Sequence, residues 1–176
     1  DQGLRRPRSE TNEADLAANG SFHVRYPVVE VAVCNSLEVS LVIVRFLGTH
    51  NAESKNTRLV SLLVDDVLAV DAGSLASELT FTEQEKIKAI LLSHGHYDHM
   101  RAVPALAFNN ASRITKVFAT TQTLEVLSSH LMDGVIYPRF FSDASFLGHK
   151  TLELVPVEPF RPQDIEGYEI TAIPVR

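Results

Sequence analysis

Four side chains of the kinds that bind metal ions lie within six residues of one another, at His94, His96, Asp98 and His99. In an extended segment His94 and His96 project to the same side, because they are two residues apart. Asp98 and His99 follow closely enough to reach a second position. Two sets of ligands indicate two metal ions, and neutral imidazole with carboxylate suits zinc, iron or manganese. Because a chance His-x-His-x-Asp-His is rare in a chain of this composition, we expect metal binding rather than four unrelated surface residues.

The residue types also indicate which chemistry the ions would serve. No cysteine lies near this run, which argues against a thiolate-rich structural zinc site. A catalytic ion keeps a position open for water, and a metal-bound hydroxide is a strong nucleophile near neutral pH. Asp98 could also orient the nucleophile or take its proton. The pattern therefore predicts a metal-dependent hydrolase.

The elements around the cluster explain how it could be held. Residues 87–92 are mostly apolar and predict a strand that ends at Ser93, so the ligands leave a strand tip. Asp98 can serve as the N-cap of a helix reaching Phe108, and Pro104 is tolerated near its first turn. Gly95 would let the backbone pass close to a metal ion or adopt a positive φ. The apolar residues that recur at helical spacing are Met100, Val103, Leu106 and Ala107.

At these residues the chain resembles the metallo-β-lactamase superfamily of metal-dependent hydrolases, whose signature is His-x-His-x-Asp-His at a strand-to-helix turn. Upstream, residues 68–74 look like the strand of that superfamily that ends in Asp-x-Gly. The resemblance implies that Asp71 supports the metal site by orienting ligating imidazoles. Taken alone, Asp71 to Ser74 could equally be a plain turn and helix start. The fold implied is an α/β (α+β) αββα sandwich with metals at the edge between two sheets, of which this chain supplies the N-terminal half or more.

Other segments are similar to the phosphodiesterase branch, which includes ribonuclease Z and the class II cyclic-nucleotide phosphodiesterases. They are residues 44–51 with their Phe-Leu-Gly-Thr sequence, residues 117–124 and residues 130–138. This resemblance implies hydrolysis of a cyclic nucleotide or similar phosphodiester by a metal-bound hydroxide. His94 and His96 would bind one ion and Asp98 and His99 the other, with zinc the first choice and manganese or iron as alternatives. A ribonuclease Z-like nuclease, a thioesterase or lactonase, and a non-catalytic truncated chain stay open.

Members of this superfamily take further ligands from later segments. Residues 168–175 look like the strand that leads to the next ligand histidine, so we expect the remaining ligands beyond Arg176 and no activity from this fragment alone. His130 falls on a predicted amphipathic helix and is expected to be a surface or packing residue. His149 follows a turn-like stretch and is assigned no ligand role. Residues 49–51 could border the cleft or form a plain turn.

Composition sets the remaining expectations. With 45% hydrophobic and 22% charged residues, the chain can bury a core. A net charge of −6 favours a small phosphodiester substrate over RNA, which usually meets a basic surface. One cysteine, Cys34, cannot form an internal disulfide, so cytoplasm is the default compartment. No membrane partner is expected, and a homodimer stays open.

The layout predicts an extension over residues 1–36, polar through about Asn19 and poorly ordered or extraneous, and a hydrolase-like domain over residues 37–176. Within the extension, residues 22–33 could form an additional strand. Asp65 and Asp66 predict a tight hairpin turn. Strands are predicted over residues 39–46, 59–64, 67–71, 87–93, 116–119, 151–157 and 168–175, and helices over residues 75–79, 99–108 and 121–131.

Overall fold

A seven-stranded sheet runs through the protein, whose computed structural model describes residues 28–35 and 38–174. Its strands, in their order across the sheet, are β1 (Val28–Asn35), β2 (Glu38–Gly48), β3 (Ser61–Val64), β4 (Leu68–Val70), β5 (Ala89–Leu91), β6 (Thr115–Ala119) and β7 (Leu152–Pro156). A separate antiparallel pair follows, β8 (Pro162–Ile165) and β9 (Tyr168–Thr171). The helical segments are α1 (Leu75–Glu78), α2 (Phe81–Gln84), α3 (Tyr97–Met100), α4 (Val103–Asn109), α5 (Thr121–Val126) and the π-helix η1 (Leu127–Leu131).

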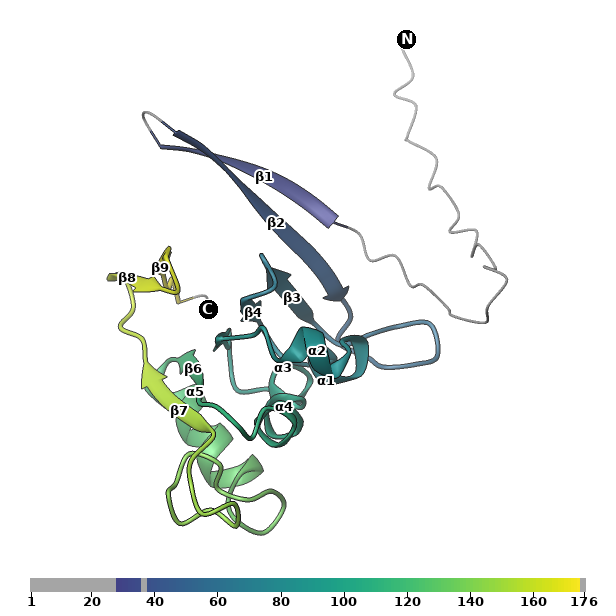
Figure 1. Cartoon of the computed structure of the whole chain (residues 1–176), viewed down its shortest axis with the longest axis vertical. Helices are drawn as coiled ribbons and strands as arrows, with labels where there is room; N and C mark the ends of the chain where they lie inside the picture. Colours follow the sequence, from purple (N-terminus) through teal and green to yellow (C-terminus); the bar gives the residue numbers. More distant parts are fainter. Residues whose placement is uncertain (1–27, 36–37, 175–176) are drawn as a thin grey trace.

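Strand direction changes in the middle of this sheet. β1 to β4 pair antiparallel, whereas β4 to β7 pair parallel, with helical segments in the connections (Figure 1). The carboxyl ends of β4, β5 and β6 therefore lie at one edge of the sheet. In open sheets with parallel strands, that edge is where ligands bind. The α/β class expected from the sequence is confirmed.

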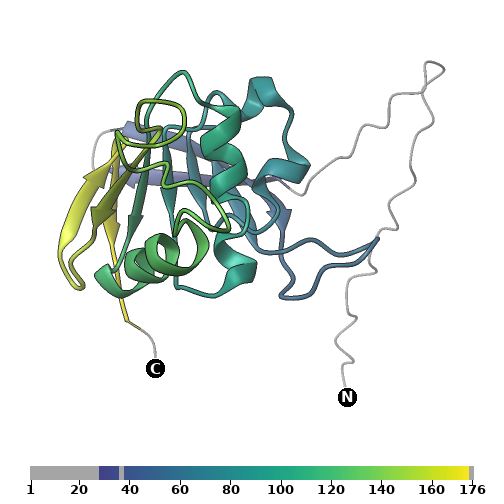
Figure 2. The same cartoon turned by 90° about the horizontal axis from the view of Figure 1, so that it is seen from below.

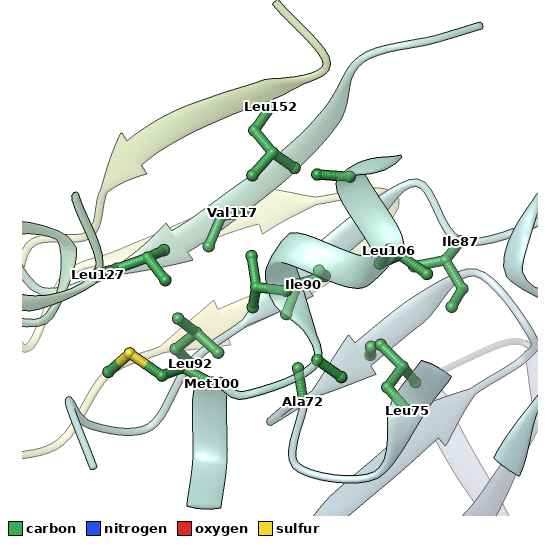
Figure 3. Close-up of a cluster of buried hydrophobic side chains, with 14 of the residues drawn as sticks. Ala72, Leu75, Ile87, Ile90, Leu92, Met100, Leu106, Val117, Leu127 and Leu152 are labelled. Atoms are coloured by element: carbon green, nitrogen blue, oxygen red, sulfur yellow. The ribbon is translucent and has the colours of Figure 1, made fainter. Parts of the chain in front are cut away.

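Two apolar layers pack on opposite faces of the sheet. Successive residues of a strand point to opposite faces, and here Ile90 and Val117 pack with the helical layer, while Ala89 and Phe118 pack towards Ile165 of β8. The helical layer and the β8–β9 pair lie on different sides of the sheet in Figure 2. The larger cluster is drawn in Figure 3. Each fully buried Leu, Ile or Val side chain contributes about 1.5–3 kcal/mol.

The predicted Asp65–Asp66 turn between β3 and β4 is confirmed. Both residues have positive φ, 46° and 61°, as the central residues of a type I′ β-turn require, and the loop between the paired strands is three residues long, 65–67. Aspartate tolerates this left-handed conformation better than most residues. Asp65 also accepts hydrogen bonds from the Ile43 backbone N–H, at 2.7 Å, and from the Tyr168 hydroxyl. The turn thus ties β9 to the main sheet.

The predicted helix over residues 99–108 is wrong in its boundaries. It is two helical segments, α3 and α4, that meet at Arg101 and Ala102. Asp98 is not an N-cap: α3 begins earlier, with His96 at its N-cap, so Asp98 lies inside the first turn. Its side chain lies near His99 instead. Pro104 lies in the first turn of α4, where a missing N–H is tolerated.

Several other boundaries differ from the predictions. The strands of the sheet expected from residue 39 to residue 157 all form, although most are shorter than predicted. β9 ends at Thr171, and β8 and α2 were not predicted. β8 could not be recognised because its PQDI sequence consists largely of proline and polar residues and shows little alternation of apolar and polar side chains. Helix α2 is one turn long and is recognisable only by the capping box of Thr80 and Glu83.

The predicted extension lies largely outside the described residues, which begin at Val28. The additional strand is confirmed in part, because Val28–Asn35 pairs along its length with β2. Residues placed in the extension thus widen the sheet, while the boundary near residue 36 stays a prediction. Across residues 28–35 and 38–174, no helix has the length and apolar character to cross a membrane.

Candidate metal centre

The predicted ligands gather at the carboxyl edge of the parallel strands. β5 ends at Leu91, the chain turns through Ser93 to His96, and α3 then carries Asp98 and His99. Asp71 comes directly after β4, the neighbouring strand. The structure therefore brings together all five residues that the sequence singled out.

His94 and His96 form the first pair of donor atoms. Nε2 of His94 lies 3.0 Å from Nδ1 of His96, and the two ring centroids are 4.6 Å apart in an edge contact. Two nitrogens at this separation can both reach one zinc ion at about 2.0–2.1 Å. The i and i+2 spacing read from the sequence thus gives the expected convergence.

Asp98 and His99 form the second pair. Nε2 of His99 lies 3.5 Å from Oδ2 of Asp98, a separation that also lets both atoms reach one ion at bonding distance. The His99 ring lies 4.0 Å, centroid to centroid, from that of His94. The two pairs therefore share one small surface region.

Asp71 orients this region from behind. Its buried carboxylate accepts hydrogen bonds from the Ser93 backbone N–H at 2.8 Å and from Nδ1 of His99 at 2.7 Å. A carboxylate is only an acceptor, so Nδ1 of His99 carries the proton and Nε2 keeps its lone pair. A neutral His99 can then bind a metal through Nε2. This is the supporting role that the resemblance implied for Asp71.

Ser93 was missed by the sequence analysis. Its hydroxyl lies 2.8–2.9 Å from both oxygens of Asp71 and 3.0 Å from Nδ1 of His94. Because the hydroxyl donates to the carboxylate, its oxygen accepts from Nδ1–H of His94, which leaves Nε2 of His94 unprotonated, 3.0 Å from Nδ1 of His96. A serine at a strand end carries no signal of this role, and only the position of Asp71 shows it.

Backbone hydrogen bonds fix the two supporting segments to each other. The Ala72 N–H donates to the His99 carbonyl at 2.6 Å, and the Ala102 N–H donates to the Ala72 carbonyl at 2.7 Å. Asp71 has a φ of 59°, which turns the chain sharply after β4. The segment after β4 therefore holds α3 by its backbone as well as by the Asp71 side chain.

The electrostatics favour a neutral His94. Partial burial lowers the pKa of His94, and the neighbouring His99 and His96 lower this pKa further, against the opposing effect of Asp71 and Asp98. Neutral imidazole is the form that binds metals. The environment thus keeps His94 in its ligand form at neutral pH.

The donor side chains are grouped two by two, so that each pair can contribute to binding one metal ion. Within residues 28–35 and 38–174, no group of three or more His, Cys, Asp or Glu side chains is arranged to hold one ion. Each pair supplies two donors of the types that zinc, iron and manganese accept. An ion at either pair needs further ligands.

The remaining candidates lie apart from the pairs. Both ring nitrogens of His149 contact backbone carbonyls, those of Leu147 and Ala111, at 3.1 and 2.8 Å. His130 lines a cavity and is described below. Gly95 does not have a positive φ; a Cβ there would lie 3.3 Å from the Val126 side chain, so α5 is its close neighbour.

Comparisons with known proteins agree with this picture. A family model described as "Beta-lactamase superfamily domain" matches residues 61–176. No curated protein matches the chain. Among solved structures, the chain is similar to the metallo-β-lactamase fold protein YhfI from Bacillus subtilis, with 20% identity, a TM-score of 0.57, and coverage of 74% of this chain and 51% of that one.

Two further structures share the fold. The chain is similar to unliganded yeast PDE1, with 13% identity, a TM-score of 0.58, and coverage of 70% of this chain and 52% of that one. It is also similar to Zn²⁺-bound PqqB from Methylobacterium extorquens, with 15% identity, a TM-score of 0.54, and coverage of 75% and 55%. The chain thus spans about half the length of these proteins.

Proposed function

Because this chain belongs to the β-lactamase superfamily, whose members are mostly metal-dependent hydrolases, we propose that it hydrolyses a phosphodiester such as a cyclic nucleotide with two bound metal ions. The observation that carries the proposal is that one carboxylate, Asp71, orients a histidine of each pair, His99 directly and His94 through the Ser93 hydroxyl. Asp71 and Ser93 leave Nε2 of both His94 and His99 unprotonated, which is the state in which an imidazole nitrogen binds metal. Metal binding requires one fixed tautomer at each of these two histidines, whereas a structural turn does not.

Each residue has a distinct part in the proposed reaction. His94 and His96 hold one ion, and Asp98 and His99 hold the other. When bound, the ions lower the pKa of coordinated water and offset charge on the phosphoryl oxygens. Asp98 also accepts or orients the proton of the attacking water. Asp71 keeps His99 in the required tautomer, and the carboxyl edge of the sheet holds the groups before substrate arrives.

We also propose the source of the remaining ligands. Each pair gives two donors, and the chain spans about half the length of the similar structures. The other ligands would come from residues outside this sequence, and a protein lacking them would be inactive. Zinc is the proposed metal, with manganese or iron as alternatives.

The substrate proposal depends on charge and on the resembling segments. A net charge of −6 does not favour a long RNA, so a small phosphodiester is preferred over a nuclease substrate. A thioester or lactone substrate is the alternative, because the same ligand pairs serve these chemistries. We further propose a cytoplasmic protein with a small-molecule substrate and no membrane partner, and its assembly as a homodimer stays open.

The test is a substrate panel with single-residue variants. Purified protein that also contains the residues proposed to supply the remaining ligands is loaded with zinc or manganese and assayed with cyclic AMP, bis-p-nitrophenyl phosphate, a thioester and a chromogenic β-lactam. We expect phosphodiester turnover that His96→Ala abolishes and His149→Gln leaves unchanged, because His149 contacts only backbone carbonyls of Leu147 and Ala111 in the structure. Turnover retained by His96→Ala, or confined to the thioester or β-lactam, contradicts the proposal.

A further inference from the structure

A cavity of about 460 Å³ is lined in part by residues that lie between the metal ligands in the sequence. Its lining residues are Gly95, Tyr97, Met100, Val126, His130, Leu131, Ile136 and Tyr137. Gly95 and Tyr97 alternate with the ligands His94, His96 and Asp98 in the sequence, so the cavity and the candidate centre share one stretch of backbone. Its volume falls within the range of small-molecule sites, about 300–1,000 Å³.

The lining combines an apolar body with a few polar groups. Met100 and Leu131 are buried at its base, while Tyr97 and Tyr137 are 59% and 36% exposed. Among the residues that the structure describes, the hydroxyls of both tyrosines and the ring of His130 have no hydrogen-bond partner. An apolar site with a few free polar groups can bind an organic group and fix its orientation.

Local structure holds the outer wall in place. The Asp133 carboxylate accepts hydrogen bonds from the backbone N–H groups of Val135 and Ile136, at 2.8 and 2.9 Å. The Gly134 N–H donates to the Tyr137 carbonyl at 2.9 Å. These bonds form a compact turn that presents Ile136 and Tyr137 to the cavity. The opposite wall comes from α5 and η1, and single π-helical turns are frequent at functional sites.

We propose that this cavity binds the nucleobase of the substrate and so places its phosphodiester beside His94, His96, Asp98 and His99. The proposal rests on the proposed function and names its substrate class as nucleotides. A base is flat and apolar on its faces, so it can stack on a tyrosine ring, while its edge can bond to hydroxyl and imidazole groups. An acyl chain has no donors or acceptors along its length that could bond to these hydroxyl and imidazole groups.

The test measures binding without turnover. Protein treated with a chelator is titrated with adenosine 5′-monophosphate and with ribose 5-phosphate, which differ by the base alone, and affinity is read from NMR shifts or calorimetry. We expect the nucleotide to bind at least about tenfold more tightly, as base stacking on an aromatic ring predicts. Tyr137→Ala should weaken nucleotide binding about tenfold, and Tyr137→Phe should retain most of it. Phe81→Ala, which removes another exposed ring, on α2, is the control and should change nothing.

The outcomes separate this proposal from the proposed function. Equal affinity for the two phosphates, or nucleotide binding indifferent to Tyr137→Ala, overturns the nucleobase site even if the protein hydrolyses bis-p-nitrophenyl phosphate. Preference for an octanoyl thioester analogue overturns it in favour of an acyl site. Base-dependent binding that Tyr137→Ala weakens supports the site, and if no phosphodiester is then hydrolysed, the proposed reaction fails and the binding site stands.

Discussion

At the scale of single residues, one buried carboxylate decides which nitrogens of the candidate centre can bind metal. Asp71 accepts from Nδ1 of His99 and, through the Ser93 hydroxyl, controls Nδ1 of His94. Neither histidine could present Nε2 reliably without these partners, because a free imidazole exchanges its two tautomers. The support is therefore as much a part of the site as the ligands are.

Asp71→Asn tests this support directly. The Ser93 N–H needs an acceptor, so the amide oxygen stays on that side and the NH₂ group faces His99. Nδ1 of His99 then becomes an acceptor and its proton moves to Nε2. We expect zinc affinity to fall about 10–100-fold, measured by competition with a chromogenic chelator. The thermal midpoint should change little, because asparagine also tolerates the positive φ of this position. Unchanged zinc affinity would show that Asp71 is only a turn residue.

The residues of the ligand run could be predicted from the sequence because their spacing is itself the signal. Side chains two residues apart on an extended segment project to the same side of the backbone, and this does not depend on the rest of the fold. Ser93 and Tyr137 could not be found in this way. The role of Ser93 depends on Asp71, 22 residues away, and the cavity of Tyr137 also takes residues from the ligand run; single-sequence spacing contains no such information.

At the scale of elements, the site depends on how closely the segment after β4 approaches α3. A Cβ added at Gly73 would lie 2.1 Å from the Asp98 carbonyl oxygen and 2.5 Å from Cβ of Leu59. Backbone atoms cannot move aside to relieve such a clash as the end of a flexible side chain can. The glycine of the Asp-x-Gly signature is therefore required by packing against the ligand helix.

Two glycine substitutions form a matched pair at this scale. Gly73→Ala should destabilise the protein by about 3 kcal/mol or more, because it forces backbone against backbone. Gly95→Ala should change the free energy of unfolding by no more than about 1 kcal/mol, since its Cβ would meet only the Val126 side chain, at 3.3 Å. Urea denaturation measures both. Similar effects of the two substitutions would refute this assignment.

The hydrogen bond from Tyr168 to Asp65 makes attachment of the β8–β9 pair depend on pH. Burial, together with the hydrogen bond to Asp65, raises the pKa of Tyr168 from 10.0 to about 12. The folded state therefore holds this proton more tightly than the unfolded state, so the stabilisation is complete below pH 10 and is lost as pH rises through 12. The protection factors of β9 amides, which correct for the intrinsic rise of exchange with pH, should fall across this window, and Tyr168→Phe should abolish this fall. Identical profiles for both proteins would contradict the role of the bond.

Elements were predictable where the pattern was long or the turn chemistry was specific. The Asp65–Asp66 turn and the strands on either side followed from residue types alone. The break between α3 and α4 did not, because apolar spacing continues across Arg101 and Ala102 although the hydrogen bonds do not. At this point the Ala102 N–H donates to the Ala72 carbonyl instead of to a carbonyl of the preceding helical turn. A tertiary contact thus ended a helix that local preference would have continued.

At the scale of the whole molecule, the sheet carries two different faces. The helical layer covers one face with a large apolar cluster, whereas the smaller cluster on the other face is covered by the β8–β9 pair. The candidate centre and the nucleobase cavity lie at the carboxyl edge of β4 to β6, on the side of α3, α5 and η1. The fold class was implied by the resemblance of the histidine run to its superfamily. The strand β8 could not be predicted, because its PQDI sequence has no clear alternating pattern.

The central claim is that the two pairs each hold a metal ion, and zinc content tests it most directly. Protein that also contains the residues proposed to supply the remaining ligands is dialysed against a fixed free zinc concentration and analysed by mass spectrometry as wild type, His96→Ala, His99→Ala and His149→Gln. The account predicts zinc in the wild type, a clear loss in His96→Ala and in His99→Ala, and no change in His149→Gln. Zinc content that is the same in all four proteins, or absent from the wild type, would contradict it.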